Sequence, residues 1–387
     1  MKKKLVRITT IPLSLKYLLG GQLGFMNQHF DVTAISSPGV ELDELESEGI
    51  NIERVYMTRK ITPLQDLRAL MELYRIFKKI KPNIVHTHTP KAGLLGMLAA
   101  KMAGVPVRLH TVAGLPLMER EGIERSMLEG IEKLTYSLAH RVYPNSQGLK
   151  GFILDKKLAE PNRVEVLANG SSNGINSQFF DLNDEIEKEA NSLKTYLKLN
   201  EGEVIFLFVG RLVADKGINE LIKAFDSLSR NYSNSRLILV GSMEEDLDPI
   251  SGESLMILKR NKRIIQTGFK KDIRPYLHLS NIFVLPTYRE GFPNVVLQAG
   301  CFHLPCIVTD INGCNEIIED GVNGLIIPPK STERLQNAMI KLLNQQELRK
   351  QMASQARAMV VRRYEQNVVW DSLLEEYQRF LSQNVAG

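Results

Sequence analysis

Cysteine, tryptophan and long apolar runs are all scarce in this sequence of 387 residues. Its three cysteines, Cys301, Cys306 and Cys314, are too few for a disulfide framework and lack the C-x-x-C spacing of zinc sites. We expect them to be buried structural thiols in a protein of the reducing cytoplasm. The longest apolar run, 92–100, is too short to cross a bilayer. No apolar segment of an export signal follows the basic residues at the start.

Several catalytic signatures are missing as well. The sequence contains no P-loop, no HExxH pair and no recognisable Ser-His-Asp set. The dinucleotide pattern G-x-G-x-x-G is incomplete, because only Gly20, Gly21 and Gly24 are present. The composition, with 43% hydrophobic and 24% charged residues, excludes a disordered chain, a collagen and a coiled coil. The length predicts two or three globular domains.

The net charge of +5 is distributed unevenly along the chain. Residues 1–170 hold 24 basic and 17 acidic side chains, a net charge of +7, and the remainder carries −2. This basic front half fits an anionic partner, such as a membrane surface, a phospholipid or a phosphate-bearing acceptor. A solvated excess of charge without a specific partner explains it equally well. Nucleic acid is not expected, because no arginine-rich or aromatic-interleaved basic motif is present.

Short apolar, β-rich runs alternate with amphipathic helical stretches, which is typical of doubly wound α/β domains. The alternation restarts after the polar loop 168–174, so we expect two similar domains with a cleft between them. Helices are expected at 63–80, 91–102, 124–139 and 217–228, and a last one at about 364–381. Strands are expected at 5–9, 31–36, 83–88, 105–109, 142–144 and 164–167, and then at 203–209, 236–240, 264–267, 282–285 and 305–309.

Two segments of the second half carry residues suited to anionic or sugar ligands. In the first, a predicted strand ends at Gly210, and Arg211 and Lys216 bracket the loop that opens the next helix, a pair suited to a diphosphate. Surface charges beside a helix start are the plainer alternative. In the second, Glu290 follows the strand 282–285 and could bind hydroxyls, or it could simply cap a helix. The free amides of Gly291, Phe292 and Asn294 could bind anionic or sugar oxygens.

The first half offers weaker signals. Gly20 and Gly21 precede a predicted helix, where paired glycines favour either a phosphate contact or a tight turn. His86 and His88 lie on one strand face, but no third ligand at useful spacing supports a metal site. We expect hydrogen-bonding histidines at this strand end, either buried or facing the cleft. His110 is a further candidate there.

These motifs, taken in order, resemble family 4 retaining glycosyltransferases of the GT-B fold. The resemblance covers most of the second domain, and weaker echoes are Gly20-Gly21, His86-Thr87-His88 and Asn169-Gly170. The main segments are Gly210-Arg211…Lys216-Gly217, Gln266-Thr267-Gly268-Phe269, Glu290-Gly291-Phe292-Pro293, Thr309-Asp310…Gly313-Cys314-Asn315-Glu316 and Gly321-Val322-Asn323-Gly324-Leu325.

The resemblance implies two Rossmann-like domains facing a central cleft. The first, 1–175, would bind the acceptor and be joined by the last helix, 364–387; the second, 200–363, would bind the nucleotide-sugar donor. It implies that Arg211 and Lys216 contact the donor diphosphate, that Glu290 contacts a sugar hydroxyl, and that no metal or other cofactor is needed. Further donor contacts are implied for Gly21, Gly210, Gly291, Phe292, Pro293, Asn294 and Gln298, and the acceptor or cleft candidates are Gly20, His88 and His110.

Two positions depart from the family pattern. Gln298 stands where a second glutamate is usual, and an amide can still bind a ribose hydroxyl. Ala113 stands where the family often has histidine, and a methyl group cannot donate a hydrogen bond; His110, three residues earlier, is the candidate substitute.

The expected function is retaining transfer from a nucleotide-sugar, preferably a UDP-sugar, to a lipid-diphosphate-linked glycan in bacterial polysaccharide synthesis. The protein would be cytoplasmic, with peripheral contact at the inner face of the plasma membrane as an open option. Two alternatives remain: a nucleotide-sugar 2-epimerase of the same fold, and a non-catalytic nucleotide-sugar-binding protein.

Overall fold

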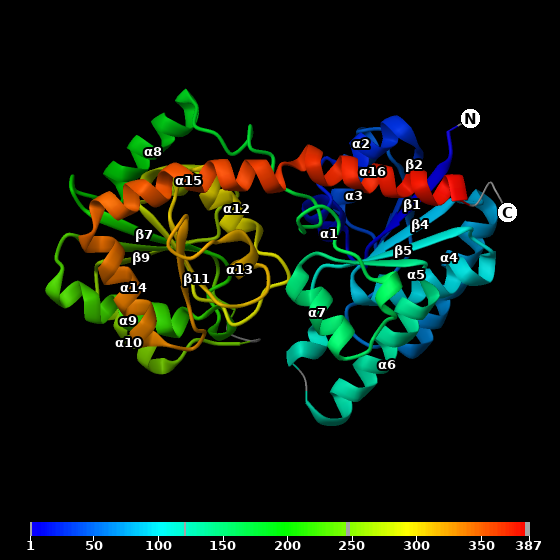
Figure 1. Ribbon diagram of the computed structural model, residues 1–387, viewed down its shortest axis with the longest axis horizontal. Helices are drawn as coiled ribbons and strands as arrows, with labels where there is room; N and C mark the ends of the chain where they lie inside the picture. The colour runs from blue at the N-terminus through cyan, green and yellow to red at the C-terminus, as the bar shows by residue number, and fades with distance from the viewer. Residues whose placement is uncertain (1, 120, 245–247, 384–387) are drawn as a thin grey trace. The chain divides into compact units, whose positions relative to one another are not determined.

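A computed structural model describes residues 2–119, 121–244 and 248–383 (Figure 1). The chain divides into two compact units. Unit 1 comprises Met1–Gly174 and Gln366–Gly387, and unit 2 comprises Ile175–Glu365. Each unit is an α/β domain built on its own six-stranded parallel sheet. Within the described part of the chain, no helix is both long and apolar enough to cross a membrane.

The sheet of unit 1 has the strand order β3-β2-β1-β4-β5-β6. Its strands are β1 (Lys4–Ile8), β2 (Asp31–Ser36), β3 (Asn51–Arg54), β4 (Ile84–His88), β5 (Val107–Val112) and β6 (Arg141–Pro144). Its helices are α1 (Pro12–Leu18), α2 (Gln22–His29), α3 (Val40–Ser47), α4 (Pro63–Ile80), α5 (Pro90–Ala103), α6 (Gly122–Leu138), α7 (Gln147–Asp155) and α16 (Gln366–Gln383), with short 3-10 turns η1 (Pro116–Glu119) and η2 (Pro161–Arg163).

The sheet of unit 2 has the order β12-β11-β10-β7-β8-β9, the same arrangement in its own chain order. Its strands are β7 (Val204–Val209), β8 (Ser235–Val240), β9 (Ile264–Gly268), β10 (Ile282–Leu285), β11 (Cys306–Thr309) and β12 (Gly324–Ile327). Its helices are α8 (Asp184–Tyr196), α9 (Ile218–Asn231), α10 (Gly252–Arg260), α11 (Arg274–Leu279), α12 (Asn294–Cys301), α13 (Cys314–Ile317), α14 (Thr332–Asn344) and α15 (Gln346–Tyr364), with the 3-10 turn η3 (Ala214–Lys216).

The strand order places one switch point in each sheet. The chain order reverses between β1 and β4 in unit 1 and between β7 and β10 in unit 2. In doubly wound sheets, ligands bind at the carboxyl ends of the strands at such a point. The loops after β1, β4, β7 and β10 are therefore where a site is expected in each unit.

Strand residues that alternate between the two sheet faces build the core of unit 1. Val6 and Ile8 pack on one face with α4 and α5, and Leu5 packs on the other with Tyr377 of α16. Figure 1 shows α16, in red, lying along α2, and these helices are in contact. The last helix of the chain therefore belongs to unit 1.

The structure differs from the sequence-based expectations of local structure at three places. No strand forms at 164–167, where Val164 makes a single isolated bridge with Val142 between η2 and the loop. The charged segment 181–199, for which no helix was predicted, contains α8, because Asn183 caps the Ile186 amide at 2.9 Å and acidic residues fill the first turn. Gly20 and Gly21 precede a helix as expected, since α2 begins at Gln22, and α1 lies between them and β1. The last helix begins at Gln366, since α15 ends at Tyr364 and the chain leaves helical geometry at Glu365.

Candidate active site

The switch point of unit 2 is shaped by glycines that permit close backbone approach. Gly217 has a φ of +69°, and a Cβ there would lie 2.0 Å from the carbonyl oxygen of Pro286, just after β10. Gly241, after β8, would place a Cβ 1.8 Å from the oxygen of Gly210. Only glycine fits at these two positions. The turn after β7 is consequently pressed against the turn after β10, and side chains from the two turns can meet.

Lys216 and Glu290 are the side chains that meet there. The Nζ atom of Lys216 lies 2.5 Å from Oε1 of Glu290, although 74 residues separate them in the sequence. Both side chains are largely shielded, with 16% and 19% of their surface exposed. Glu290 is not a helix cap, because α12 begins at Asn294 and Pro293 occupies its N-cap position. A partly shielded ammonium–carboxylate pair at a sheet's carboxyl edge can bind a phosphate and a hydroxyl together.

Arg211 lies in the same turn but is more exposed. Its guanidinium donates to Glu244 Oε2 at 2.8 Å. With 46% of its side chain exposed, Arg211 can exchange this partner for an anionic ligand at small cost, since exposed ion pairs contribute about 0–1 kcal/mol.

A second ion pair joins the same two turns and was not assigned from the sequence. Arg289 donates to Asp215 Oδ2 at 2.6 Å, and the Asp215 amide donates to Asp248 Oδ2 at 2.6 Å. The Tyr288 amide donates to the Asp215 carbonyl at 2.9 Å. These bonds hold the residues adjacent to Lys216 and Glu290 in place. In the sequence, the sign of these two ion pairs was that an acidic and a basic residue are adjacent in each turn, Asp215-Lys216 in one and Arg289-Glu290 in the other.

The loop after β11 supports the Glu290–Pro293 segment from the other side. The Asn312 side-chain amide donates to the carbonyl oxygens of Glu290 and Gly291. Gly313, with a φ of +79°, leaves room that a Cβ would fill, because it would lie 3.0 Å from the Gly291 oxygen and 2.9 Å from Pro293 Cδ. This support fixes the backbone that leads into α12.

Helix α12 presents the remaining donor candidates of unit 2. Phe292 is buried against the ring of Tyr364, with ring centroids 5.2 Å apart, so it packs rather than projects. Pro293 is also buried, and Asn294 and Gln298, four residues apart, share one half-buried face of the helix. The first amides of a helix have no intrahelical acceptor, and they create a positive potential that suits a phosphate or sugar oxygen.

In unit 1, the Gly20-Gly21 pair forms the turn between α1 and α2. Gly21 has a φ of +76°, and a Cβ there would lie 2.9 Å from the Trp370 ring. The Gly20 carbonyl accepts a hydrogen bond of 2.9 Å from the Asn173 side chain. The pair therefore allows α16 and the loop 168–174 to approach α2.

The histidines of unit 1 are buried and hydrogen-bonded. His86 contacts the Tyr377 hydroxyl through Nδ1 at 2.6 Å and the Thr111 hydroxyl through Nε2 at 2.7 Å. His88 stacks on His86 and accepts from Arg7. His110 contacts Thr87 Oγ1 at 2.8 Å and packs below α5.

Burial lowers the pKa of His110 to about 4, so the ring is neutral at physiological pH. The space beside Ala113 is not filled by this imidazole, which lies among side chains of β4, α5 and α6.

No metal-ligating cluster was found among the described residues, which include both strand-end histidines. All three cysteines are buried free thiols, as expected. Burial also raises the pKa of Cys301 to about 12. A structural interpretation of the cysteines is therefore confirmed.

Comparison with known proteins identifies the family. Residues 189–359 match the model of group 1 glycosyl transferases, and residues 22–146 match that of glycosyl transferase 4-like proteins. The capsular polysaccharide biosynthesis glycosyltransferase CapM of Staphylococcus aureus is 32% identical over 384 residues, covering 99% of this chain and 98% of CapM.

A second relative is the UDP-Gal:alpha-D-GlcNAc-diphosphoundecaprenol alpha-1,3-galactosyltransferase of Escherichia coli. It is 29% identical over 323 residues, which cover 82% of this chain and 81% of that enzyme. Among solved structures, Anabaena Alr3699/HepE in complex with UDP and glucose matches with a TM-score of 0.81 and 17% identity, covering 97% of this chain and 100% of HepE.

The structural match shows the GT-B fold, and the 32% sequence identity to CapM over nearly the full length of both chains shows the family. The site at the switch point of unit 2 lies within the segment that matches the group 1 model. This chain is therefore a member of the group 1, family 4-like glycosyltransferases with the GT-B fold.

Proposed function

We propose that this glycosyltransferase moves a sugar, with retention of anomeric configuration, from a UDP-sugar to a lipid-diphosphate-linked glycan in polysaccharide biosynthesis. The observation that carries the proposal is the Lys216–Glu290 pair, with Arg211 beside it, at the switch point of unit 2. The names of the relatives support the donor and acceptor classes, since one includes UDP-Gal and a diphosphoundecaprenol acceptor and another a capsular pathway. Unit 2 would bind the donor and unit 1 the acceptor.

The proposed chemistry needs charge compensation at the leaving diphosphate. When the bond between sugar and phosphate breaks, negative charge grows on the departing phosphate oxygen. Lys216 would supply a point charge and Arg211 a planar fork of donors to that diphosphate. The departing oxygen would take the acceptor proton, so Ala113 would need to supply no base. Glu290 would accept a hydrogen bond from a donor sugar hydroxyl while keeping Lys216 in place, and the α12 amides with Gln298 would hold the rest of the donor.

A donor screen tests this proposal. Thermal shift and release of nucleotide diphosphate are measured with UDP-, GDP-, ADP- and dTDP-sugars, without added metal. We expect stabilisation by a UDP-sugar, and we expect Lys216→Ala to lower transfer by about 100-fold. Lys350→Ala, which changes an exposed lysine in α15, is the matched control.

Each other outcome of the screen points elsewhere. Equal turnover by the wild type and by a variant lacking both Arg211 and Lys216 side chains would contradict the diphosphate role. A product that stays attached to the nucleotide would indicate an epimerase, and binding without transfer would indicate a non-catalytic binding protein. Proton NMR of the product gives the anomeric configuration, and inversion would contradict retention.

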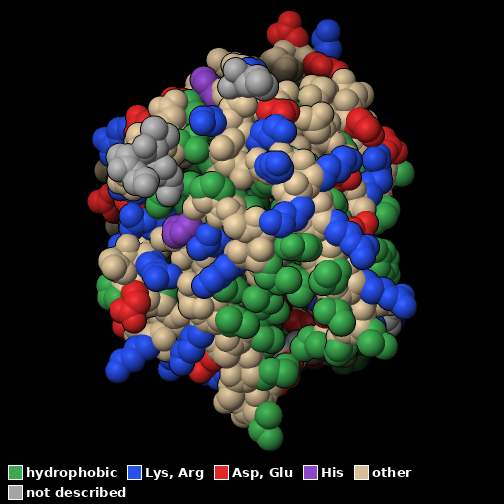
Figure 2. Space-filling view, turned by 90° about the vertical axis from the view of Figure 1, so that its right-hand side faces the viewer, with side chains coloured by type: hydrophobic (Ala, Val, Ile, Leu, Met, Phe, Trp, Pro, Cys, Tyr) green, Lys and Arg blue, Asp and Glu red, His purple; other side chains and the backbone are tan. Residues whose placement is uncertain are grey.

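We further propose a peripheral contact between unit 1 and an anionic membrane on the cytoplasmic side. Helix α4 buries one face, yet its opposite face carries exposed apolar and basic side chains in a single stripe at helical spacing. The stripe consists of Leu64, Leu67, Arg68, Met71, Arg75 and Lys78. Figure 2 shows apolar side chains gathered beside Lys and Arg on the side of unit 1 that carries α4. Such a stripe suits the headgroup region of an acidic bilayer.

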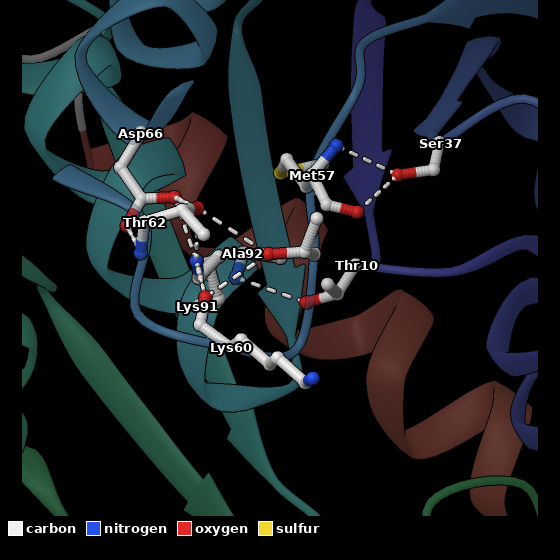
Figure 3. A network of polar contacts seen from close by, with 9 residues as sticks. Thr10, Ser37, Met57, Lys60, Thr62, Asp66, Lys91 and Ala92 are labelled. Carbon is white, nitrogen blue, oxygen red and sulfur yellow. Dashed lines mark hydrogen bonds and ion pairs between the residues drawn. The ribbon is translucent and has the colours of Figure 1, made fainter. Parts of the chain in front are cut away.

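A partly buried polar network supports the start of this helix (Figure 3). Lys91, in the first turn of α5, donates to Asp66 Oδ1 at 2.6 Å and also contacts the Lys60 carbonyl and Thr62. The two charged side chains are only 12% and 21% exposed. This network fixes the loop that carries Arg59, Lys60 and Ile61 next to the stripe.

Vesicle sedimentation tests the membrane contact. We expect the protein to bind vesicles containing phosphatidylglycerol, but not vesicles of phosphatidylcholine alone, with binding weakened by salt. Changing Leu64 and Leu67 to glutamate should abolish binding. The same change at Tyr196 and Leu255, two exposed apolar residues of unit 2, is the control. Equal sedimentation of both pairs of variants would contradict the contact.

A further inference from the structure

The interior of unit 1 contains a cation without an opposing charge. Arg7, in β1, is fully buried. Its Nε and Nη2 atoms donate to His88 Nε2 at 3.1 and 2.9 Å, and Nη2 also donates to Gln22 Oε1 at 2.6 Å. Both partners are neutral, because an imidazole nitrogen that accepts from a guanidinium carries no proton. Within the described residues, no carboxylate contacts Arg7, and its Nη1 atom has no hydrogen-bond partner.

Three polar atoms that lack partners come from residues around one small cavity. Besides Arg7 Nη1, the Asn145 Oδ1 and Ser172 Oγ atoms are buried without a partner among the described residues. All three residues line the same cavity, together with His88 and Thr111. The cavity offers about 10 Å³ to the centre of a water-sized sphere, which is room for about one oxygen atom. Buried polar groups of this kind lower the stability of the folded protein unless a hydrogen-bond partner pairs with them.

The residues that line the cavity determine which kind of oxygen atom can bind in it. Arg7 can only donate, and it disfavours a cation. Asn145 presents its carbonyl oxygen, because its Nδ2 already donates to the Ala113 carbonyl at 3.2 Å, and that oxygen disfavours an anion. Ser172 can donate or accept. A neutral oxygen that both accepts and donates satisfies both demands, as in a water molecule or the hydroxyl group of a ligand that displaces it: the oxygen accepts from Arg7 and its hydrogen is donated to Asn145.

The cavity also lies where a ligand is expected. Arg7 is in β1 and His88 ends β4, so they flank the switch point, and Asn145 directly follows β6. The loop 168–174 forms one wall of it, since Ser171 and Ser172 line the cavity, the Ser171 amide donates to the Asn145 carbonyl at 2.7 Å and Gln22 donates to the Ser172 carbonyl at 3.1 Å. The site is therefore built from the carboxyl edge of the sheet and one loop of the same unit.

We propose that Arg7, Asn145 and Ser172 form a subsite for one hydroxyl group of the acceptor sugar. This rests on the proposed function, in which unit 1 binds the acceptor. The subsite distinguishes acceptors by a single hydroxyl, because a sugar that lacks it leaves the guanidinium and the amide oxygen unpaired.

The single tryptophan of the chain provides a readout independent of catalysis. Trp370 donates from Nε1 to Asn173 Oδ1 at 2.8 Å, and Gln22, which contacts Arg7, also donates to Asn173 Oδ1 at 3.2 Å. A ligand that engages Arg7 should therefore alter the surroundings of the indole and its fluorescence.

The experiment titrates the full chain with methyl glycosides of glucose, galactose, N-acetylglucosamine and N-acetylgalactosamine, and with their monodeoxy analogues, and follows Trp370 fluorescence. We expect at least one glycoside to bind and one of its deoxy analogues to bind about tenfold more weakly. In Asn145→Ala and Ser172→Ala the difference between parent and analogue should shrink, because only part of the subsite still pairs with the hydroxyl. The controls Asn162→Ala and Ser126→Ala change exposed residues of unit 1 and should preserve the difference.

The outcomes separate this inference from the proposed function. If no glycoside binds at concentrations up to about 100 mM, or if the two site variants keep the full preference of the wild type, the subsite is wrong and the cavity holds a water molecule only. UDP-sugar binding and transfer would stand in either case. Conversely, absence of donor binding alongside a hydroxyl preference that Asn145→Ala reduces would overturn the donor site and leave the subsite intact. Circular dichroism confirms folding of each variant, and Ser172→Ala removes one oxygen only.

Discussion

Individual glycines decide how closely the turns of the donor site approach each other. The restriction at Gly217 is double, because its φ is positive and the space for a Cβ is taken by the Pro286 carbonyl. Gly202, also in unit 2, has a φ of +80°, but a Cβ there would meet nothing within 4 Å. The two positions therefore separate backbone strain from steric overlap.

We expect Gly217→Ala to lower the free energy of unfolding by about 3 kcal/mol, because the turn must shift away from β10. Gly202→Ala should cost only about 1 kcal/mol, the strain of a left-handed alanine. Urea unfolding of both variants measures the difference. Equal losses would mean that the turn after β7 is free to move.

The buried carboxyl group of Glu132 contributes a pH dependence to the stability of unit 1. Glu132, in α6, is 5% exposed, and burial raises its pKa to about 7 from an ordinary value of 4.5. Between these values the unfolded chain ionises while the folded chain holds the proton, so the unfolded state gains stability as the pH rises. The free energy of unfolding should fall by about 3 kcal/mol from pH 4.5 to pH 7 through this group, and then level off.

Glu132→Gln keeps the shape and removes the titration. We expect the variant to become more stable than the wild type at pH 7.5, and its advantage to shrink towards pH 4.5. Thermal unfolding at several pH values checks this. A constant difference across the range would show that Glu132 does not titrate as described.

At the scale of whole elements, α16 is bound to unit 1 by a few buried side chains. Tyr377 is fully buried, and its hydroxyl lies 2.6 Å from His86 Nδ1. Its ring lies edge-on to Phe30, with centroids 5.7 Å apart. A helix from the end of the chain therefore completes the core on one face of the first sheet.

Tyr377→Phe should destabilise the protein by about 1–2 kcal/mol, since it leaves the His86 nitrogen buried and unpaired. Tyr196→Phe, which changes a tyrosine that is 81% exposed, should have no measurable effect. Chemical denaturation of both variants gives the comparison. Wild-type stability in Tyr377→Phe would mean that the His86 contact contributes nothing.

At the scale of the molecule, the two units differ in how many segments of the chain form them. Unit 2 is one continuous segment, Ile175–Glu365, whereas unit 1 needs Gln366–Gly387 in addition to Met1–Gly174. Removing the C-terminal segment therefore takes core residues, including Leu373, out of unit 1 and leaves the core of unit 2 intact.

We expect a fragment of residues 175–365 to unfold cooperatively, and a chain ending at residue 365 to show a destabilised unit 1 that proteases cleave. Calorimetry and limited proteolysis measure both. A protease-resistant unit 1 in the shortened chain would contradict the role assigned to α16.

Local sequence pattern was sufficient to predict the doubly wound α/β architecture. It also singled out the segments 210–217 and 290–294 as candidates for ligand binding. Strand alternation, helical spacing and turn chemistry are properties of neighbouring residues, so β2, α4 and β10 were predicted with their observed bounds. The helix α8 was missed because its charged composition resembles a linker, and its cap becomes meaningful only when a helix is assumed.

Contacts between distant segments were decided by the tertiary structure. The pairing of Lys216 with Glu290 depends on β7 and β10 lying side by side, which no local pattern encodes. In the same way, the sequence shows Arg7 only as one polar residue in an apolar strand. It becomes a candidate binding group because folding brings Asn145 and Ser172 to the same cavity. Local sequence determines which elements form, because their stability rests on neighbouring residues, and packing determines which side chains share a site.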